Sequence, residues 1–164
     1  MQSVGEVMSI GRTFKESLQK AYRSLEVGLD GLEPKSFSKN DPDLTRSRFL
    51  DMSTLRYATS FRLLKIRQAL VDGMTIENIY QQTKIDPWFL NQIKDLVGMG
   101  LGTPIRTLKQ NGFSDKQISR LMKKTENEIR SIRKVQSVVP SFKIVDTCAA
   151  EFEAQTPYCY SSYE

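Results

Sequence analysis

Residues 112–118 read Gly-Phe-Ser-Asp-Lys-Gln-Ile and combine the signals that end one helix and begin the next. Ser114 and Gln117 have the spacing of a capping box, in which each side chain hydrogen-bonds the backbone N–H of the other residue. Phe113 and Ile118 stand at the two positions of a hydrophobic staple, which fixes the direction from which the chain enters the helix. The stretch therefore predicts a tight junction between two short helices.

The same kind of signal recurs along the chain. A near repeat, Gly-Met-Thr-Ile-Glu-Asn-Ile, occupies residues 73–79, and Asp86 precedes a proline at the one helical position that tolerates it. A Thr-x-x-Glu capping box predicts a helix over 13–27 that ends at Gly28, where a left-handed residue is needed. The expected helix starts are Thr13, Thr59 or Ser60, Thr75, Asp86, Thr103, Ser114 and Thr125.

The densest apolar cluster follows Asp86, and we expect it to form the centre of the core. Its members are Trp88, Phe89, Leu90, Ile93, Leu96 and Val97. After Pro140 the sequence changes to the alternation Ser-Phe-Lys-Ile-Val, which predicts a short extended piece, followed by an aromatic-rich tail with little local partner of its own. The expected fold class is therefore all-α, made mostly of short capped helices, with an extended C-terminal segment.

The composition excludes many kinds of active site. The chain has 164 residues, 39% of them hydrophobic, and it contains no histidine. This length suffices for one compact domain with a core of its own. Without histidine there is no Ser-His-Asp or Cys-His arrangement and no histidine-ligated metal. Cys148 and Cys159 form no C-x-x-C motif, so a cysteine zinc site is unsupported and reduced thiols are expected.

The remaining candidates for chemistry are weak. The glycine-rich residues 98–102 follow a predicted helix rather than a strand and lack the Lys-Ser/Thr of a phosphate loop. We therefore predict no catalytic, cofactor-binding or metal-ligating residue. No apolar run is long enough to cross a bilayer, and Met1-Gln-Ser-Val lacks the features of a signal peptide, so we expect a cytoplasmic protein without a membrane partner.

The net charge of +5 comes mostly from one segment. Residues 104–134 hold nine basic and three acidic residues, a net charge of +6. One interpretation is a nucleic-acid-binding module, with a helix-turn-helix over 75–97 and this segment on the phosphates. The second helix of that motif begins Pro-Trp-Phe-Leu, which is apolar where base-reading side chains are needed. We prefer a turn between packed helices and a solvated basic face, with nucleic-acid binding as the alternative.

Both ends of the chain carry a family resemblance. Residues 3–28, SVGEVMSIGRTFKESLQKAYRSLEVG, closely resemble the end of the first synthetase half of the carbamoyl-phosphate synthase large subunit. Residues 145–164, VDTCAAEFEAQTPYCYSSYE, are similar to the segment that leads into its second half. Between them, residues 85–93 and 112–118 look like the helical middle region of that family.

The resemblance implies the connection, or oligomerisation, domain that lies between two ATP-grasp synthetase halves. Residues 1–28 would end the first half and provide a linking helix, 29–140 would form the helical connection domain, and 141–164 would lead to the second half. The resemblance also implies the reaction of the whole enzyme, which makes carbamoyl phosphate from bicarbonate, glutamine-derived ammonia and ATP for arginine and pyrimidine synthesis.

In the family, ATP and Mg or Mn are bound by the flanking modules, so the resemblance implies no cofactor for this fragment, which alone is expected to be inactive. The implied partners are the flanking ATP-grasp modules of the same chain, a glutaminase small subunit and further copies of the chain in a homo-oligomer, with no nucleic acid. Glu6 matches a family position close to the internal route between the active sites, and we expect it to line that passage.

Overall fold

The computed structural model describes residues 6–33, 52–145, 147–149, 151–153 and 155–164. Their contacts divide the chain into two compact units. Unit 1 comprises Met1–Gly31 and Leu101–Glu164, and unit 2 comprises Leu32–Gly100. The sequence predicts a different division, at residues 28 and 140, where the flanking synthetase halves would join the chain. The contacts within this chain do not test that division, which stays a prediction.

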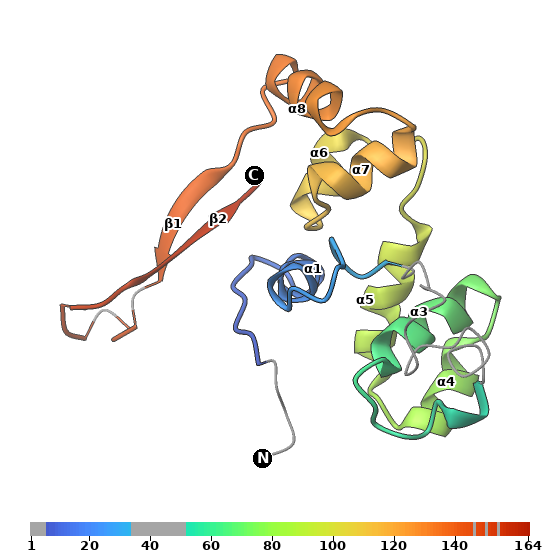
Figure 1. The fold of residues 1–164 in the computed structure, drawn as a ribbon. Coiled ribbons are helices and arrows are strands. Elements are labelled where there is room, and N and C mark those ends of the chain that lie inside the picture. The colour runs from blue at the N-terminus through green and yellow to red at the C-terminus, as the bar shows by residue number, and fades with distance from the viewer. Residues whose placement is uncertain (1–5, 34–51, 146, 150, 154) are drawn as a thin grey trace. The chain divides into compact units, whose positions relative to one another are not determined.

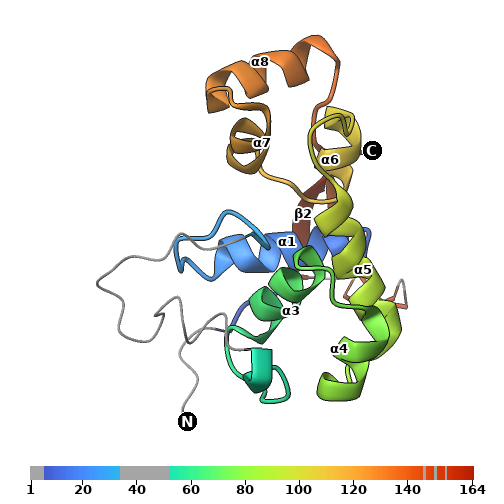
Figure 2. The same ribbon diagram turned by 90° about the vertical axis from the view of Figure 1, so that its right-hand side faces the viewer.

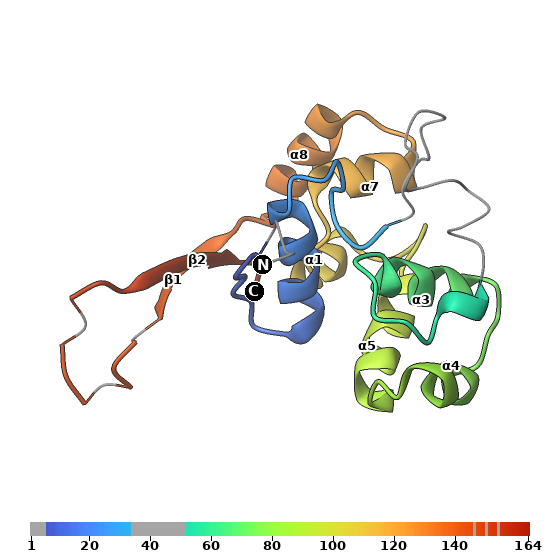
Figure 3. The same cartoon turned by 60° about the horizontal axis from the view of Figure 1, so that its bottom comes forward.

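Unit 2 is a small helical cluster. It contains a 3-10 turn, η2 (Met52–Thr54), and the helices α3 (Arg62–Val71), α4 (Ile76–Thr83) and α5 (Pro87–Gly98). Helices α3 and α4 both pack against α5, and Figure 3 shows α3 running beside it. The side chains between them are aliphatic and buried: Leu55, Leu64, Ile66, Ala69, Ile79, Leu90, Ile93 and Leu96.

The expected centre of the core is only partly correct. Leu90, Ile93 and Leu96 are buried, but Trp88 and Phe89 are 53% and 41% exposed, so placing those two rings in the core was wrong. The buried residues repeat every three positions and form one stripe on α5, whereas the two rings stand on the first turn, away from that stripe. The rings contact each other edge to face, with centroids 4.9 Å apart.

Unit 1 contains both ends of the chain and, within the described residues, four helices. Its helices are α1 (Phe14–Ser24), α6 (Ile105–Gln110), α7 (Asp115–Met122) and α8 (Glu126–Val135), and Figure 2 shows α7 and α8 as a packed pair. Two strands follow, β1 (Ser141–Val145) and β2 (Tyr158–Ser162). The fold class expected from the sequence, mostly short helices with an extended C-terminal segment, is confirmed.

The C-terminal segment is a β-hairpin (Figure 1). Strands β1 and β2 are antiparallel, with Ser141 opposite Ser162 and Val145 opposite Tyr158. The aromatic-rich tail thus has a partner in β1, where the sequence led us to expect little local partner. The pairing was missed because a strand partner is set by tertiary context as much as by local pattern.

The predicted caps determine where most helices begin. The side chains of Thr75 and Asp86 accept from backbone N–H groups of α4 and α5, and complete capping boxes form at Ser114 and Thr125.

Three starts or ends differ. Helix α3 begins at Arg62, and its N-cap residue, Phe61, lies one or two positions after the expected start at Thr59 or Ser60 and makes no side-chain cap. Helix α6 begins after Pro104, with no side-chain cap at Thr103. Helix α1 ends at Ser24, and Glu26 takes the first left-handed conformation (φ 54°).

Removal of one cap should have a moderate effect. We expect Ser114→Ala to lower the free energy of unfolding by about 1 kcal/mol, because the Gln117 amide in the first turn of α7 loses the Ser114 hydroxyl that it donates to. Ser119 is half-buried on α7, and its hydroxyl donates to the Lys116 carbonyl within the same helix, so Ser119→Ala should change stability by less than about 0.5 kcal/mol. Urea unfolding of both variants checks the difference, and equal losses would contradict it.

Candidate functional site

The first part of the site is a buried carboxylate on α1. Glu16 is 1% exposed. Thr13 caps the helix as predicted, accepting from the Glu16 amide, but the Glu16 carboxylate does not close the expected box. It accepts instead from the Arg12 amide at 2.7 Å and from the Ser162 hydroxyl at 3.1 Å. One side chain therefore joins the segment before α1 to the last strand.

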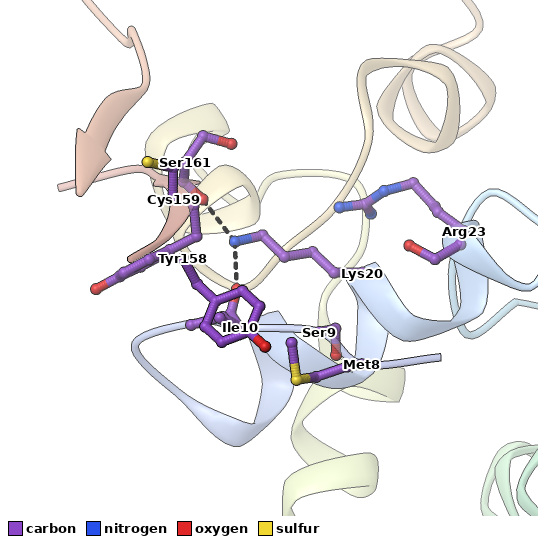
Figure 4. Close-up of a pocket in the computed structure, with 10 residues that line it drawn as sticks. Met8, Ser9, Ile10, Lys20, Arg23, Tyr158, Cys159 and Ser161 are labelled. Carbon is purple, nitrogen blue, oxygen red and sulfur yellow. Dashed lines mark hydrogen bonds between the residues drawn. The ribbon is translucent and has the colours of Figure 1, made fainter. Parts of the chain in front are cut away.

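Lys20, one turn further along α1, completes this arrangement. Its ammonium lies 2.8 Å from the Glu16 carboxylate and donates to the carbonyl oxygens of Ile10 at 2.8 Å and Ser161 at 2.5 Å. Figure 4 shows the ammonium between these two backbone segments. The three acceptors match the three N–H donors of a lysine. We call Glu16 and Lys20 together the clamp.

An open cavity of about 420 Å³ lies beside the clamp. Its walls are the segment before α1, the α1 side chains Lys20 and Arg23, and strand β2 (Figure 4). The lining residues are Met8, Ser9, Ile10, Lys20, Arg23, Ser24, Tyr158, Cys159, Tyr160 and Ser161. The cavity is therefore formed where the two ends of unit 1 meet α1.

The second part of the site is a buried ion-pair triad at the junction predicted from residues 112–118. Asp115, the first residue of α7, lies 2.8 Å from the Lys109 ammonium and 2.9 Å from the Arg133 guanidinium. Lys109 also donates to the Phe113 carbonyl and Arg133 to the Val138 carbonyl. Because the two cations come from α6 and α8, the triad joins all three helices.

Tyr163 covers the triad from the C-terminal end of the chain. Its ring centroid lies 4.8 Å from the Lys109 ammonium and 5.5 Å from the Arg133 guanidinium carbon. Both distances are within the range of cation–π attraction. The residue after β2 is thus held by the same charges that join the helices.

The electrostatics of the triad favour an ionised Asp115. Burial alone would raise the pKa of this carboxyl, but hydrogen bonds and charges from Lys109 and Arg133 outweigh burial and hold the pKa below its usual value. Burial lowers the pKa of Lys109, and the contact with Asp115 opposes that shift. The carboxylate is therefore what makes two buried cations tolerable in the core.

A close backbone approach links the clamp to the triad. Gly112 has a φ of +84°, and a Cβ placed there would lie 2.9 Å from the Cα and carbonyl oxygen of Glu16. Arg23 donates to the Gly112 carbonyl at 2.5 Å. Helix α1 thus rests directly on the turn between α6 and α7, and only glycine fits at the contact.

The structure changes the interpretation of the basic segment. Lys109 and Arg133 are 6% and 8% exposed, so describing all of residues 104–134 as a solvated face was wrong for these two. Sequence reasoning missed them because their partner, Asp115, was assigned only to a helix start. The presence of one acidic residue inside a basic stretch was the sequence signal that could have indicated a buried ion pair.

The start of α5 does not favour the nucleic-acid-binding alternative. The exposed rings of Trp88 and Phe89 stand where a recognition helix needs polar groups.

Glu6 is the first described residue and is exposed. It is not among the residues that line the cavity beside the clamp, and its place along an internal passage stays a prediction.

Within the ranges that the structure describes, no three His, Cys, Asp or Glu side chains group closely enough to hold a metal ion. In those same ranges, no helix combines the length and apolar character that crossing a membrane requires.

Comparison with known proteins identifies similar sequences over the whole chain. Residues 6–137 match the family model for the oligomerisation domain of the carbamoyl-phosphate synthetase large chain. The chain is 44% identical to the carbamoyl phosphate synthase large chain of Archaeoglobus fulgidus and 45% identical to that of Synechocystis sp., with all of this chain aligned in both. It is also 45% identical over its full length to the arginine-specific, chloroplastic large chain of Arabidopsis thaliana. It spans 14–16% of the length of these relatives.

Proposed function

Because the chain belongs to the carbamoyl-phosphate synthetase large-chain family, as its oligomerisation domain, we propose that it acts as the structural connection within such an enzyme. In this role it fixes the separation of the two ATP-grasp modules that precede and follow it. It also provides a surface for self-association, and the enzyme works in the cytoplasm.

The clamp is the observation that supports this role best. Lys20 and Glu16 hold the segment before α1 and strand β2 against one helix, and these are the segments through which flanking modules would be attached. The family model matches residues 6–137, whereas the relatives align with all of the chain, which supports our proposal that residues 141–164 lead on towards the second flanking module. A packed helical block keeps two modules at a defined distance better than a flexible linker does.

The whole enzyme, in this proposal, makes carbamoyl phosphate from bicarbonate, ammonia released by a glutaminase small subunit, and ATP. ATP and its Mg or Mn are bound by the flanking modules. A defined spacing matters there because a labile intermediate must pass between distant sites without loss to water. Glu6, close to the start of the chain, is proposed to line that passage.

The first test is catalytic. The isolated chain should show no bicarbonate-dependent ATP hydrolysis above a protein-free blank, because the groups that bind nucleotide lie in the flanking modules. Release of phosphate from ATP in the presence and absence of bicarbonate measures this directly. Bicarbonate-stimulated hydrolysis by the isolated chain would contradict the proposed structural role.

The second test concerns self-association. Sedimentation equilibrium over a wide range of protein concentrations should show dimers or larger species, since the domain is proposed to contribute an oligomer contact. A molecular mass that stays at the monomer value at every concentration would remove self-association from the proposal and restrict the role to spacing.

A further inference from the structure

We infer that Lys20 and Glu16 are positioning residues that couple the segment before α1 to the segment of β2, so that displacement of one segment shifts the other. The inference rests on the proposed function and names the two side chains that would link the flanking modules. It concerns the communication between the two flanking modules, and neither residue touches substrate.

The contacts of the clamp are shared between the two segments. Glu16 accepts from the Arg12 amide on one side and from the Ser162 hydroxyl on the other. Lys20 donates to the Ile10 carbonyl on one side and to the Ser161 carbonyl on the other. Each charged group therefore touches both segments, although Lys20 and Ser161 are 141 positions apart in the sequence.

The number of donors makes these contacts interdependent. The Lys20 ammonium has three N–H groups, and Glu16, Ile10 and Ser161 provide three acceptors. If either backbone carbonyl moves, the ammonium must follow it or lose a charge-assisted hydrogen bond. The Lys20 side chain is 20% exposed and the Glu16 side chain 2%, so a rearrangement that draws the ammonium away from Glu16 leaves a buried carboxylate that water does not readily reach. The two segments are therefore expected to move together.

A second bridge between the same segments differs in its environment. Arg12 and Glu164 form an ion pair at 3.1 Å, but both side chains are 52% exposed. Exposed pairs are weak and are screened by salt, whereas a buried pair is screened much less. At physiological ionic strength, the connection between the segments thus depends mainly on Lys20 and Glu16.

The test uses the full-length large chain with its glutaminase subunit. In the double variant Glu16→Gln with Lys20→Met, both charges are removed at similar volume, so no buried carboxylate is left unpaired. We expect the carbamoyl phosphate formed per ATP hydrolysed to fall about five-fold or more, which corresponds to loss of a typical coupling between sites. Bicarbonate-dependent ATP hydrolysis should persist, because the flanking modules are unchanged.

Three further variants sharpen the test. Lys20→Arg keeps a cation that can donate to both carbonyls and should recover part of the yield. Ser162→Ala removes one hydrogen bond to Glu16 without stranding a charge, so it should lower the yield in a smaller step even if the double variant does not fold. Lys134→Met removes an exposed lysine of α8 in the same unit and should leave the yield at the wild-type value.

The outcomes separate the inference from the proposed function. If the wild-type enzyme makes no carbamoyl phosphate, the proposed function fails. If the wild type makes it and the double variant and Ser162→Ala keep the wild-type yield per ATP, the clamp does not couple the modules and the inference is overturned. A similar loss in Lys134→Met would also overturn it, because the effect would then not be specific to the clamp.

Discussion

Asp115→Asn is expected to lower the free energy of unfolding by roughly 3–5 kcal/mol, the usual cost of removing one partner from a buried ion pair. The substitution keeps the shape of the side chain but leaves Lys109 and Arg133 buried without a counter-charge. Because the triad joins α6, α7 and α8, the loss should be cooperative across unit 1. Urea unfolding followed by circular dichroism measures it.

Asp30 provides a matched control for Asp115. It also pairs with two cations, Lys116 at 3.3 Å and Arg120 at 2.8 Å, but the side chains of these partners are 59% and 48% exposed. Asp30→Asn should therefore cost no more than about 1 kcal/mol, as surface ion pairs do. Equal losses from the two Asp→Asn substitutions would contradict the importance of burial at the triad.

The effect of Asp115 should depend on pH in a defined direction. Its pKa is lower in the folded chain than in the unfolded chain, so its stabilisation is complete above the unfolded value of about 4 and is lost as the pH falls below it. The difference in stability between the wild type and Asp115→Asn should therefore shrink from pH 6 to pH 3. A difference that stays constant over this range would mean that the carboxylate charge is not what stabilises the triad.

Gly112→Ala is expected to destabilise the chain by roughly 2–5 kcal/mol, combining the cost of a left-handed alanine with that of overpacking. The new Cβ would lie 2.8 Å from the Gln19 Cβ and 2.9 Å from backbone atoms of Glu16. Backbone atoms of α1 have no rotamer by which to move away, so the whole helix must shift from the turn between α6 and α7. The unfolding midpoint in urea should fall accordingly.

Gly28→Ala separates the two contributions. Gly28 has a similar φ of +76°, but a Cβ there would meet nothing within 4 Å. This variant should lose only the conformational cost, about 1–2 kcal/mol. If Gly112→Ala were no more destabilising than Gly28→Ala, the close approach of α1 to the turn would not contribute to stability.

Sequence reasoning was most successful where a signal is local. The caps at Thr75, Asp86, Ser114 and Thr125 are all present, because a cap involves residues only two or three positions apart. The short helices and their order follow from these caps. The family resemblance, carried by both ends of the chain, is likewise confirmed by alignment over the full length.

Sequence reasoning failed where a side chain has a distant partner. Glu16 looked like the second half of a capping box, but its carboxylate reaches Ser162, which is 146 positions away. Lys109 and Arg133 looked solvated because their neighbours in sequence are polar, and only the packing of α6, α7 and α8 buries them. The clamp and the triad therefore needed the structure, since burial and long-range pairing leave little trace in local pattern.

The most direct test of the proposed structural role is to replace residues 14–162 of the full-length large chain, from the start of α1 to the end of β2, with a flexible Gly/Ser linker of equal length. This replacement removes the clamp together with the helices. Such a linker leaves the two proposed flanking modules attached but no longer fixes their separation. We expect bicarbonate-dependent ATP hydrolysis to persist while the carbamoyl phosphate formed per ATP falls severely. A linker variant that keeps the wild-type yield per ATP would contradict the role of this domain in positioning the modules.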